Sequence, residues 1–247
     1  MRHQLFFAVI SCVLAALIAR PVAAAEFYPT ALRLGREKPV TTLRIRNNET
    51  TRKTYELTGF RWNQQNGRDV LTSDKNFIVT PPILRLEPDQ EAIVRVGLLT
   101  VDDAVPSEQA YRLVVDDITP RAKSEGETLS LRIRMVLPVF LAATTPGASV
   151  AFTPARVENG RVCIAGQNNG DSHAQAVWIA YGQTPQKKIS AFQYFLAGAS
   201  ADICTDALPP NAVSRPIIIG LTSGDRSSVT PHEVQPGNDQ ETSAPRE

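Results

Sequence analysis

Few side chains in this sequence could carry out acid–base or nucleophilic chemistry. The chain has three histidines, and only His173 and His232 lie beyond its apolar N-terminal segment. His173 follows Gly170-Asp171-Ser172 in a predicted turn, which is typical of a solvated loop residue. A catalytic triad needs a positioned imidazole, and no cysteine–histidine spacing is typical of zinc. The sequence therefore favours neither an enzyme, nor a metal site, nor a cofactor.

Two arginines are unusual because they interrupt apolar strand sequence. Arg95 stands in IVRVGL and Arg112 in AYRLVV. A guanidinium among apolar residues needs an anionic partner, since its burial without one is costly. That partner is either an internal carboxylate, such as Glu108 or Asp117, or the carboxylate of another molecule, which the planar fork of arginine suits. Spacing alone favours the internal ion pair for both arginines.

The first 25 residues have the pattern of a secretory signal peptide. Arg2 precedes an apolar run from Leu5 to Ala19, and the small residues around Ala24 form a cleavage site. The run is shorter than the about 20 residues of a membrane span. We therefore expect a cleaved signal and an exported mature chain, with no membrane insertion.

The mature chain has a near-neutral charge and two cysteines. Loss of Arg2 and Arg20 from the 26 basic residues leaves 24 against 25 acidic residues, which gives no support to nucleic-acid binding. Cys12 leaves with the signal peptide. Because the compartment is oxidising, Cys163 and Cys204 are predicted to form one disulfide.

The elements that position these residues are predicted to be strands throughout. Residues 26–143 contain seven short strands at the spacing of an immunoglobulin-like sandwich. After a linker-like segment, residues 149–224 contain a second, smaller set of strands, to which the two cysteines belong. Residues 225–247 are polar and rich in Pro, Ser and Glu, so we expect most of this tail to be disordered. The predicted fold is all-β, with two β-sandwich domains.

The last strand of the first domain, Leu129–Ala142, has an unusual apolar face. Its first half alternates strictly, with Leu129, Leu131, Ile133 and Met135 on one face. Pro138 removes a ladder donor, which favours an edge position. An apolar edge strand must be covered, either by another part of this chain or by a different protein.

Three segments together resemble the periplasmic chaperones of chaperone–usher pilus systems, the PapD-like superfamily. They are PPILRLEPDQEAIVRV, YRLVVDDITP and LRIRMVLPVFLA. The resemblance covers about residues 26–142 well and the second domain only loosely. The segments GFRWNQ and YRLVVDD are most similar to the archaic branch, which serves Csu and spore-coat-type fimbriae.

The resemblance implies an L-shaped pair of immunoglobulin-like domains and a chaperone that lends its seventh strand to a pilus subunit. The donor residues would be Leu129, Leu131, Ile133, Met135 and Leu137.

The basic anchors of the better-known branch are absent, because Ala31 and Pro138 stand at their positions. In the archaic branch an arginine of the sixth strand binds the subunit's C-terminal carboxylate, and Arg112 stands at the position of that arginine. The family's interdomain salt bridge would involve Arg95, Glu108 and Asp225.

We therefore expect a non-enzymatic chaperone that binds a fimbrial subunit by donor-strand complementation. Its partners would be that subunit and an outer-membrane usher. The competing interpretation is a free-standing exported sandwich, structural or adhesive, with no client.

Overall fold

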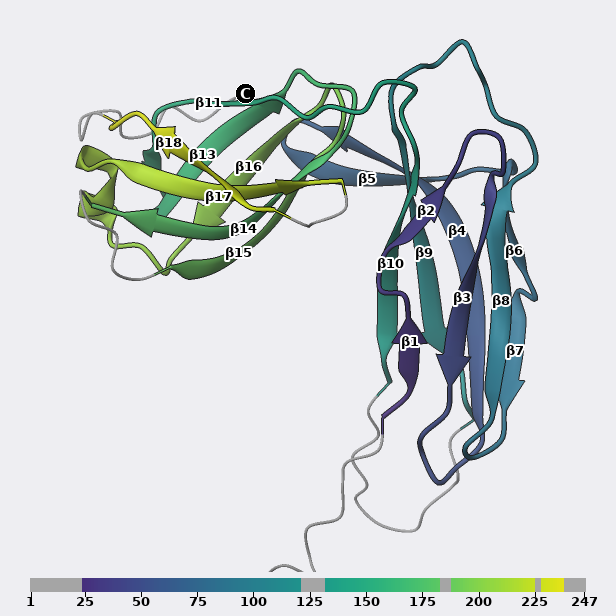
Figure 1. Ribbon diagram of the computed structural model, residues 1–247. Coiled ribbons are helices and arrows are strands. Elements are labelled where there is room, and N and C mark those ends of the chain that lie inside the picture. Colours follow the sequence, from purple (N-terminus) through teal and green to yellow (C-terminus); the bar gives the residue numbers. More distant parts are fainter. Residues whose placement is uncertain (1–23, 121–131, 183–187, 225–227, 238–247) are drawn as a thin grey trace, which may run out of the picture.

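The computed structural model describes residues 24–120, 132–182, 188–224 and 228–237. These residues form strands and loops, together with one short 3-10 helix, η1 (Pro210–Ser214). The strands make two β-sandwiches that meet like the arms of an L (Figure 1). Within the described residues, no helix has the length and apolar character needed to cross a membrane.

The first sandwich has two sheets. The strands of one sheet lie in the order β1 (Glu26–Tyr28), β3 (Val40–Arg46), β8 (Glu91–Leu98) and β6 (Phe77–Thr80). Those of the other lie in the order β2 (Leu32–Leu34), β10 (Arg134–Leu141), β9 (Gln109–Asp117), β4 (Lys53–Gln65) and β5 (Arg68–Ser73), and β7 (Ile83–Leu86) also pairs with β4. The pairing of β2 with β10 is parallel, and the other pairings of this sandwich are antiparallel.

The core of this sandwich follows from the period of two in its strands. Leu43 and Ile45 of β3 belong to the same buried cluster as Leu113 and Val115 of β9, while the alternate residues of β3 are exposed. Full burial of each large apolar side chain contributes about 1.5–3 kcal/mol. Gly59 has a packing role here, because a Cβ at this position would lie only 1.7 Å from the Phe77 ring.

The second sandwich is smaller and has two four-stranded sheets. One contains β11 (Val150–Phe152), β13 (Arg161–Asn168), β12 (Arg156–Glu158) and β16 (Ser200–Thr205). The other has the order β15 (Ile189–Phe195), β14 (Ala174–Tyr181), β17 (Ile217–Ser223) and β18 (Thr230–Val234).

Strand β18 lies within residues 225–247, the segment for which the sequence predicted no strand. It pairs with β17, and its last residue, Val234, lies opposite Ile217 and is buried in the second core. The polar composition of the segment concealed this strand, because Val234 alone provides the buried contact.

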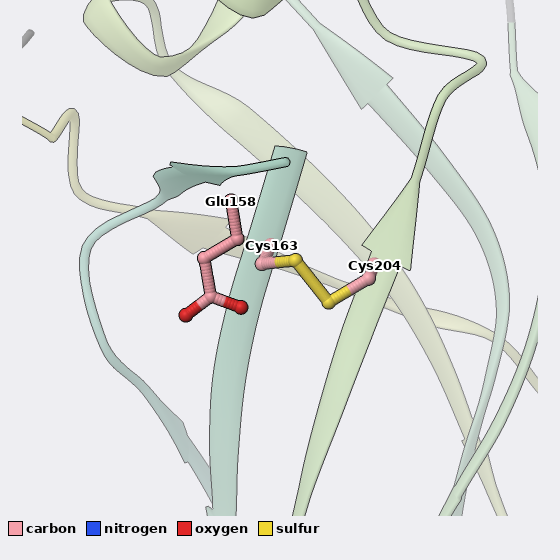
Figure 2. A group of neighbouring side chains, drawn as sticks. All are labelled: Glu158, Cys163 and Cys204. Atoms are coloured by element: carbon pink, nitrogen blue, oxygen red, sulfur yellow. A yellow bond between two sulfur atoms is a disulfide. The ribbon is translucent and has the colours of Figure 1, made fainter. Parts of the chain in front are cut away.

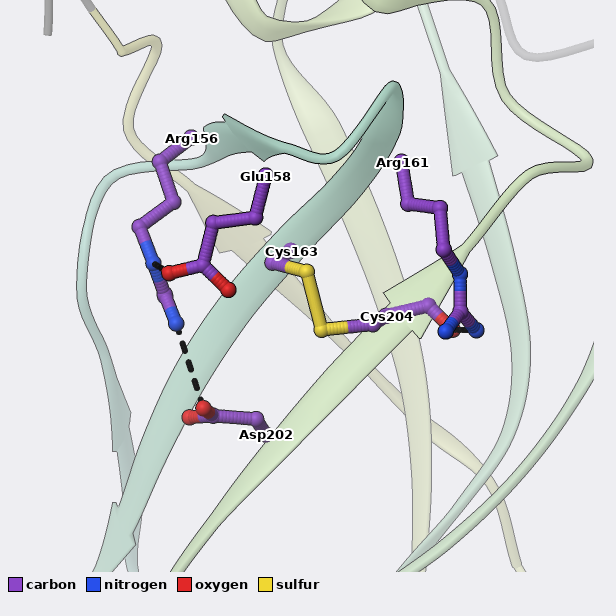
Figure 3. The surroundings of a disulfide bond; sticks show 6 residues. All are labelled: Arg156, Glu158, Arg161, Cys163, Asp202 and Cys204. Carbon is purple, nitrogen blue, oxygen red and sulfur yellow. Dashed lines mark hydrogen bonds and ion pairs between the residues drawn. A yellow bond between two sulfur atoms is a disulfide. The ribbon is translucent and has the colours of Figure 1, made fainter. Parts of the chain in front are cut away.

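The disulfide between Cys163 and Cys204 joins β13 to β16 (Figure 2). The two residues are directly opposite each other in the strand register. Around them, Arg156 lies between Glu158 at 2.7 Å and Asp202 at 3.1 Å (Figure 3). Among the described residues, Glu158 and the two cysteines are the only cluster with metal-ligand atoms this close together. Because the two sulfur atoms are bonded to each other, they are not thiolates that could ligate a cation, and the cysteines instead link the two strands covalently.

Candidate functional site

Strand β10 has one edge that is only partly covered. It pairs with β9 along its whole length, from Arg134 opposite Asp116 to Leu141 opposite Gln109. On its other side, β2 pairs only with Val139–Leu141. In the described part of the chain, no strand pairs with the outer edge of the preceding residues, Arg134–Pro138. This edge offers free backbone donors and acceptors to another strand.

The apolar face of β10 changes from buried to exposed along this open edge. Leu137 is 2% exposed and belongs to the first core, Met135 is half-buried against that core, and Ile133, which immediately precedes β10, is 42% exposed. Leu137, one of the expected donor residues, thus packs into the chain's own core. Leu129 and Leu131, which continue the row, lie outside the described residues.

Arg112 lies on the opposite face of the same sheet, toward the second sandwich. Its register partners are Pro138 of β10 and Phe60 of β4. The guanidinium carbon is 3.4 Å from the centre of the Trp62 ring and 5.3 Å from that of Tyr194. Such cation–π contacts hold the plane of the guanidinium and leave its N–H edges available.

The nearest anion to Arg112 is Asp69 of β5, whose carboxylate oxygen is 3.6 Å from Nη2. The Arg112 side chain is 14% exposed, whereas that of Asp69 is 45% exposed. Burial lowers the pKa of Arg112, and the charge of Asp69 opposes this effect. The guanidinium nevertheless stays protonated at any physiological pH. The site therefore holds a buried positive charge with one loosely placed counterion.

Arg112 opens into a cleft of about 310 Å³ between the two sandwiches. The cleft is lined by Asp69, Leu71, Arg112, Val136, Phe192, Gln193 and Tyr194. Arg112 is the only cation among these residues, and Val136 connects the cleft to the open edge of β10. Sequence reasoning identified Arg112 but missed Asp69 and Phe192, because β5 and β15 are remote from it in the chain.

A buried pair, Glu108 and His173, holds the two sandwiches together beside this cleft. The Glu108 carboxylate is 2.7 Å from Nδ1 of His173 and accepts a hydrogen bond of 2.9 Å from its backbone N–H. The imidazole stacks on the Phe140 ring at 3.8 Å. The expectation of a solvated His173 was wrong, because Glu108, just before β9, and Phe140 of β10 contact this residue and bury it.

Further contacts complete this joint. Gln64 donates to the carbonyl of Tyr194 at 2.8 Å and accepts from the N–H of Leu196 at 2.9 Å. Trp62 and Phe140 of the first sandwich pack with Tyr194 and Leu196 of the second in one apolar cluster. The cleft walls are thus fixed relative to each other by apolar packing and by hydrogen bonds.

The expected interdomain salt bridge is not formed as predicted. Arg95 lies on the exposed face of β8, between Thr42 and Thr80, and no ion pair joins it to any described residue. Its proposed partner Glu108 contacts His173 instead, and Asp225 lies outside the described residues.

Asp117, the other internal carboxylate considered for the arginines, belongs to a different contact. It pairs with Lys53 at 3.2 Å. Burial would raise the pKa of Asp117, but hydrogen bonds from Thr119 and Lys53 outweigh it and hold this pKa below its ordinary value.

Known proteins share this architecture and part of this sequence. Residues 25–145 match the family described as pili and flagellar-assembly chaperone, PapD N-terminal domain. Among curated proteins, none is significantly similar in sequence to this chain.

Solved structures with the same fold are pilus chaperones and their complexes. A chain of the archaic CsuC–CsuE chaperone–tip adhesion subunit complex of Acinetobacter baumannii matches with a TM-score of 0.67 and 19% identity, over 86% of this chain and 98% of that chain. A chain of the Salmonella enterica SafA–SafB pilin–chaperone complex matches with a TM-score of 0.62 and 16% identity, over 87% of this chain and 97% of that chain. The CupB2 chaperone of Pseudomonas aeruginosa matches with a TM-score of 0.57 and 14% identity, over 84% of this chain and 98% of that chain. Residues 25–145 of this chain therefore form a domain of the pili and flagellar-assembly chaperone family, of the PapD N-terminal type.

Proposed function

We propose that this chain is a periplasmic chaperone that binds a pilus subunit by lending it the open edge of β10. The subunit's strand would pair with the outer edge of Arg134–Pro138. Ile133 and Met135, together with Leu129 and Leu131, would fill the subunit's open apolar groove. This is strand addition to a sheet that lacks one strand. The archaic-type complex named above supports this role, because it joins a chaperone to a tip adhesion subunit.

The observation that carries the proposal is the gradient of burial along one face of β10. A strand that served only its own sandwich would lose its apolar pattern where its core ends. Here the pattern continues past Leu137, through half-buried Met135 to exposed Ile133, along an edge that no described strand covers. Exposed apolar edges are an aggregation liability, so a sequence that retains one has a use for it.

Arg112 would anchor the C-terminal carboxylate of the subunit. Its stacking on Trp62 orients the guanidinium before binding, which lowers the entropic cost of forming a two-point contact. The present counterion, Asp69, is 3.6 Å away, which is longer than a good charge-assisted hydrogen bond. A carboxylate entering the cleft can therefore make a shorter contact than Asp69 does.

The family resemblance extends this proposal to delivery. The chaperone would block premature polymerisation and transfer the subunit to an outer-membrane usher, where a donor segment of the next subunit replaces β10. No nucleotide is required, because the exchange is driven by better packing of the replacing strand.

The experiment is native mass spectrometry of the tagged chain purified from the periplasm of its own host. We expect a one-to-one complex with a small exported protein, and Ile133→Asp should abolish it. Ile133 is substantially exposed, so its replacement should leave the melting temperature almost unchanged. Ile93→Asp is the matched control, since Ile93 is also exposed but lies on β8 in the other sheet. A monomer in the wild type, or an intact complex in Ile133→Asp, would contradict the proposal.

A further inference from the structure

Three large apolar side chains are exposed around the cleft at Arg112. They are Leu71 of β5, Val136 of β10 and Phe192 of β15. Phe192 is the most exposed of the large apolar residues described, at 80%. Apolar residues scattered singly over a surface need no explanation, but several around one concave site indicate binding.

The cleft therefore has a charged side and an apolar side. Arg112 and Asp69 form the charged side, and the three apolar residues surround it from both sandwiches. The Phe192 ring lies nearly perpendicular to the Tyr194 ring, with the ring centres 6.4 Å apart. A volume of about 310 Å³ is at the lower end of ligand pockets, so the cleft fits one or two residues of a chain end.

We propose that this cleft selects the side chain of the subunit's C-terminal residue, and that it favours an apolar or aromatic one. The inference rests on the proposed function, because it takes the carboxylate at Arg112 as the fixed point. With that carboxylate in place, the terminal side chain has Leu71, Val136 and Phe192 as neighbours. An acidic terminal side chain is disfavoured, because Asp69 would repel it.

Short peptides test this selectivity on the free chaperone. The probes are two acetylated pentapeptides, Gly-Ser-Gly-Ser-Phe and Gly-Ser-Gly-Ser-Ser, each with a free carboxylate and as the C-terminal amide. Binding is followed by tryptophan fluorescence, since Trp62 lies directly beneath Arg112. We expect the phenylalanine acid to bind about tenfold more tightly than the serine acid, and more tightly than its own amide.

Variants separate the two sides of the cleft. Phe192→Ser should reduce the preference for phenylalanine over serine to about threefold or less and keep the preference for acid over amide. Because Phe192 is exposed, this change should leave the fold intact. Ile93→Ser, a matched exposed position on β8, should change neither ratio.

The outcomes distinguish this inference from the carboxylate anchor. Equal binding of the phenylalanine acid and amide would overturn both. A preference for acid without a preference for phenylalanine, or a phenylalanine preference unchanged in Phe192→Ser, would overturn the selectivity and leave the anchor standing. If no peptide bound at millimolar concentration, the cleft would not be a preformed site and the selectivity would fall, while client capture in the periplasm would still support the chaperone.

Discussion

Replacing Glu108 by alanine should weaken the coupling between the two sandwiches. Glu108 and His173 expose only 6% and 3% of their side chains, so their contacts are shielded from water. The substitution removes two hydrogen bonds to the carboxylate, at 2.7 and 2.9 Å. Hydrogen bonds to a charged group contribute about 1.5–3 kcal/mol each, so the loss of both contacts sets the scale of the effect. We expect the free energy that couples the two sandwiches to fall by about 3–5 kcal/mol.

Urea unfolding provides the assay, because each sandwich carries one of the two tryptophans, Trp62 and Trp178. We expect one cooperative transition in the wild type and two separated transitions in Glu108→Ala. The matched control is Glu87→Ala. Glu87 is 2.6 Å from Arg52, yet their side chains are 56% and 64% exposed, and such pairs contribute about 0–1 kcal/mol. Equal effects of the two substitutions, or an unchanged single transition in Glu108→Ala, would refute the argument that burial sets the strength of this contact.

Two further predictions concern stability. Replacing Cys163 and Cys204 together by serine should destabilise the second sandwich by about 4 kcal/mol, because the bond closes a loop with a sequence separation of 41 residues; a change below about 1 kcal/mol in urea unfolding would contradict this. Asp117→Asn should cost about 1–3 kcal/mol at pH 7 through lost contacts with Lys53 and Thr119. The pKa of Asp117 is lower in the folded state than in the unfolded state, where it is about 3.9. The stabilising contribution of the carboxylate is therefore fully present above about pH 3.9 and is lost as the pH falls further. The difference in stability between variant and wild type should shrink in acid and not grow.

The strands could be predicted from the sequence wherever one face is buried and the other is wet. The segment of β3 alternates strictly, and its buried and exposed residues follow that pattern in the structure. The disulfide followed from cysteine count and compartment alone. Strand β18 was missed because its single buried anchor, Val234, gives no period to detect.

Parts of the candidate site depend on residues far apart in the chain, and this limits what local sequence can show. His173 sits in a polar turn, so its sequence neighbours predict exposure. Its burial comes from Glu108 and Phe140, which the fold brings to it. In the same way, nothing near Arg112 in sequence indicates Asp69 or Phe192, which come from another hairpin and from the other sandwich.

The period of two in β10 also could not show where the chain's own core ends. Leu137 and Ile133 occupy equivalent places in the pattern, yet one is buried and the other is exposed. The difference comes from the packing of the first core, which includes Leu137 and is contacted by Met135 but does not include Ile133. Tertiary structure decides which residues of the row pack against the core, and the alternation of apolar and polar residues in the sequence is the same in either case.

This arrangement links the carboxylate anchor to the donor row through a single strand. Arg112 lies opposite Pro138 in the register of β9 and β10, and Ile133 precedes Pro138 by five residues, a distance of about 17 Å at 3.3 Å per residue. A subunit held by its carboxylate at Arg112 would therefore meet the donor side chains at a fixed distance. A slip of one residue would turn Arg134, which points to Asp116, into an apolar groove. On this account, the anchor sets the register, and the apolar row contributes most of the binding energy.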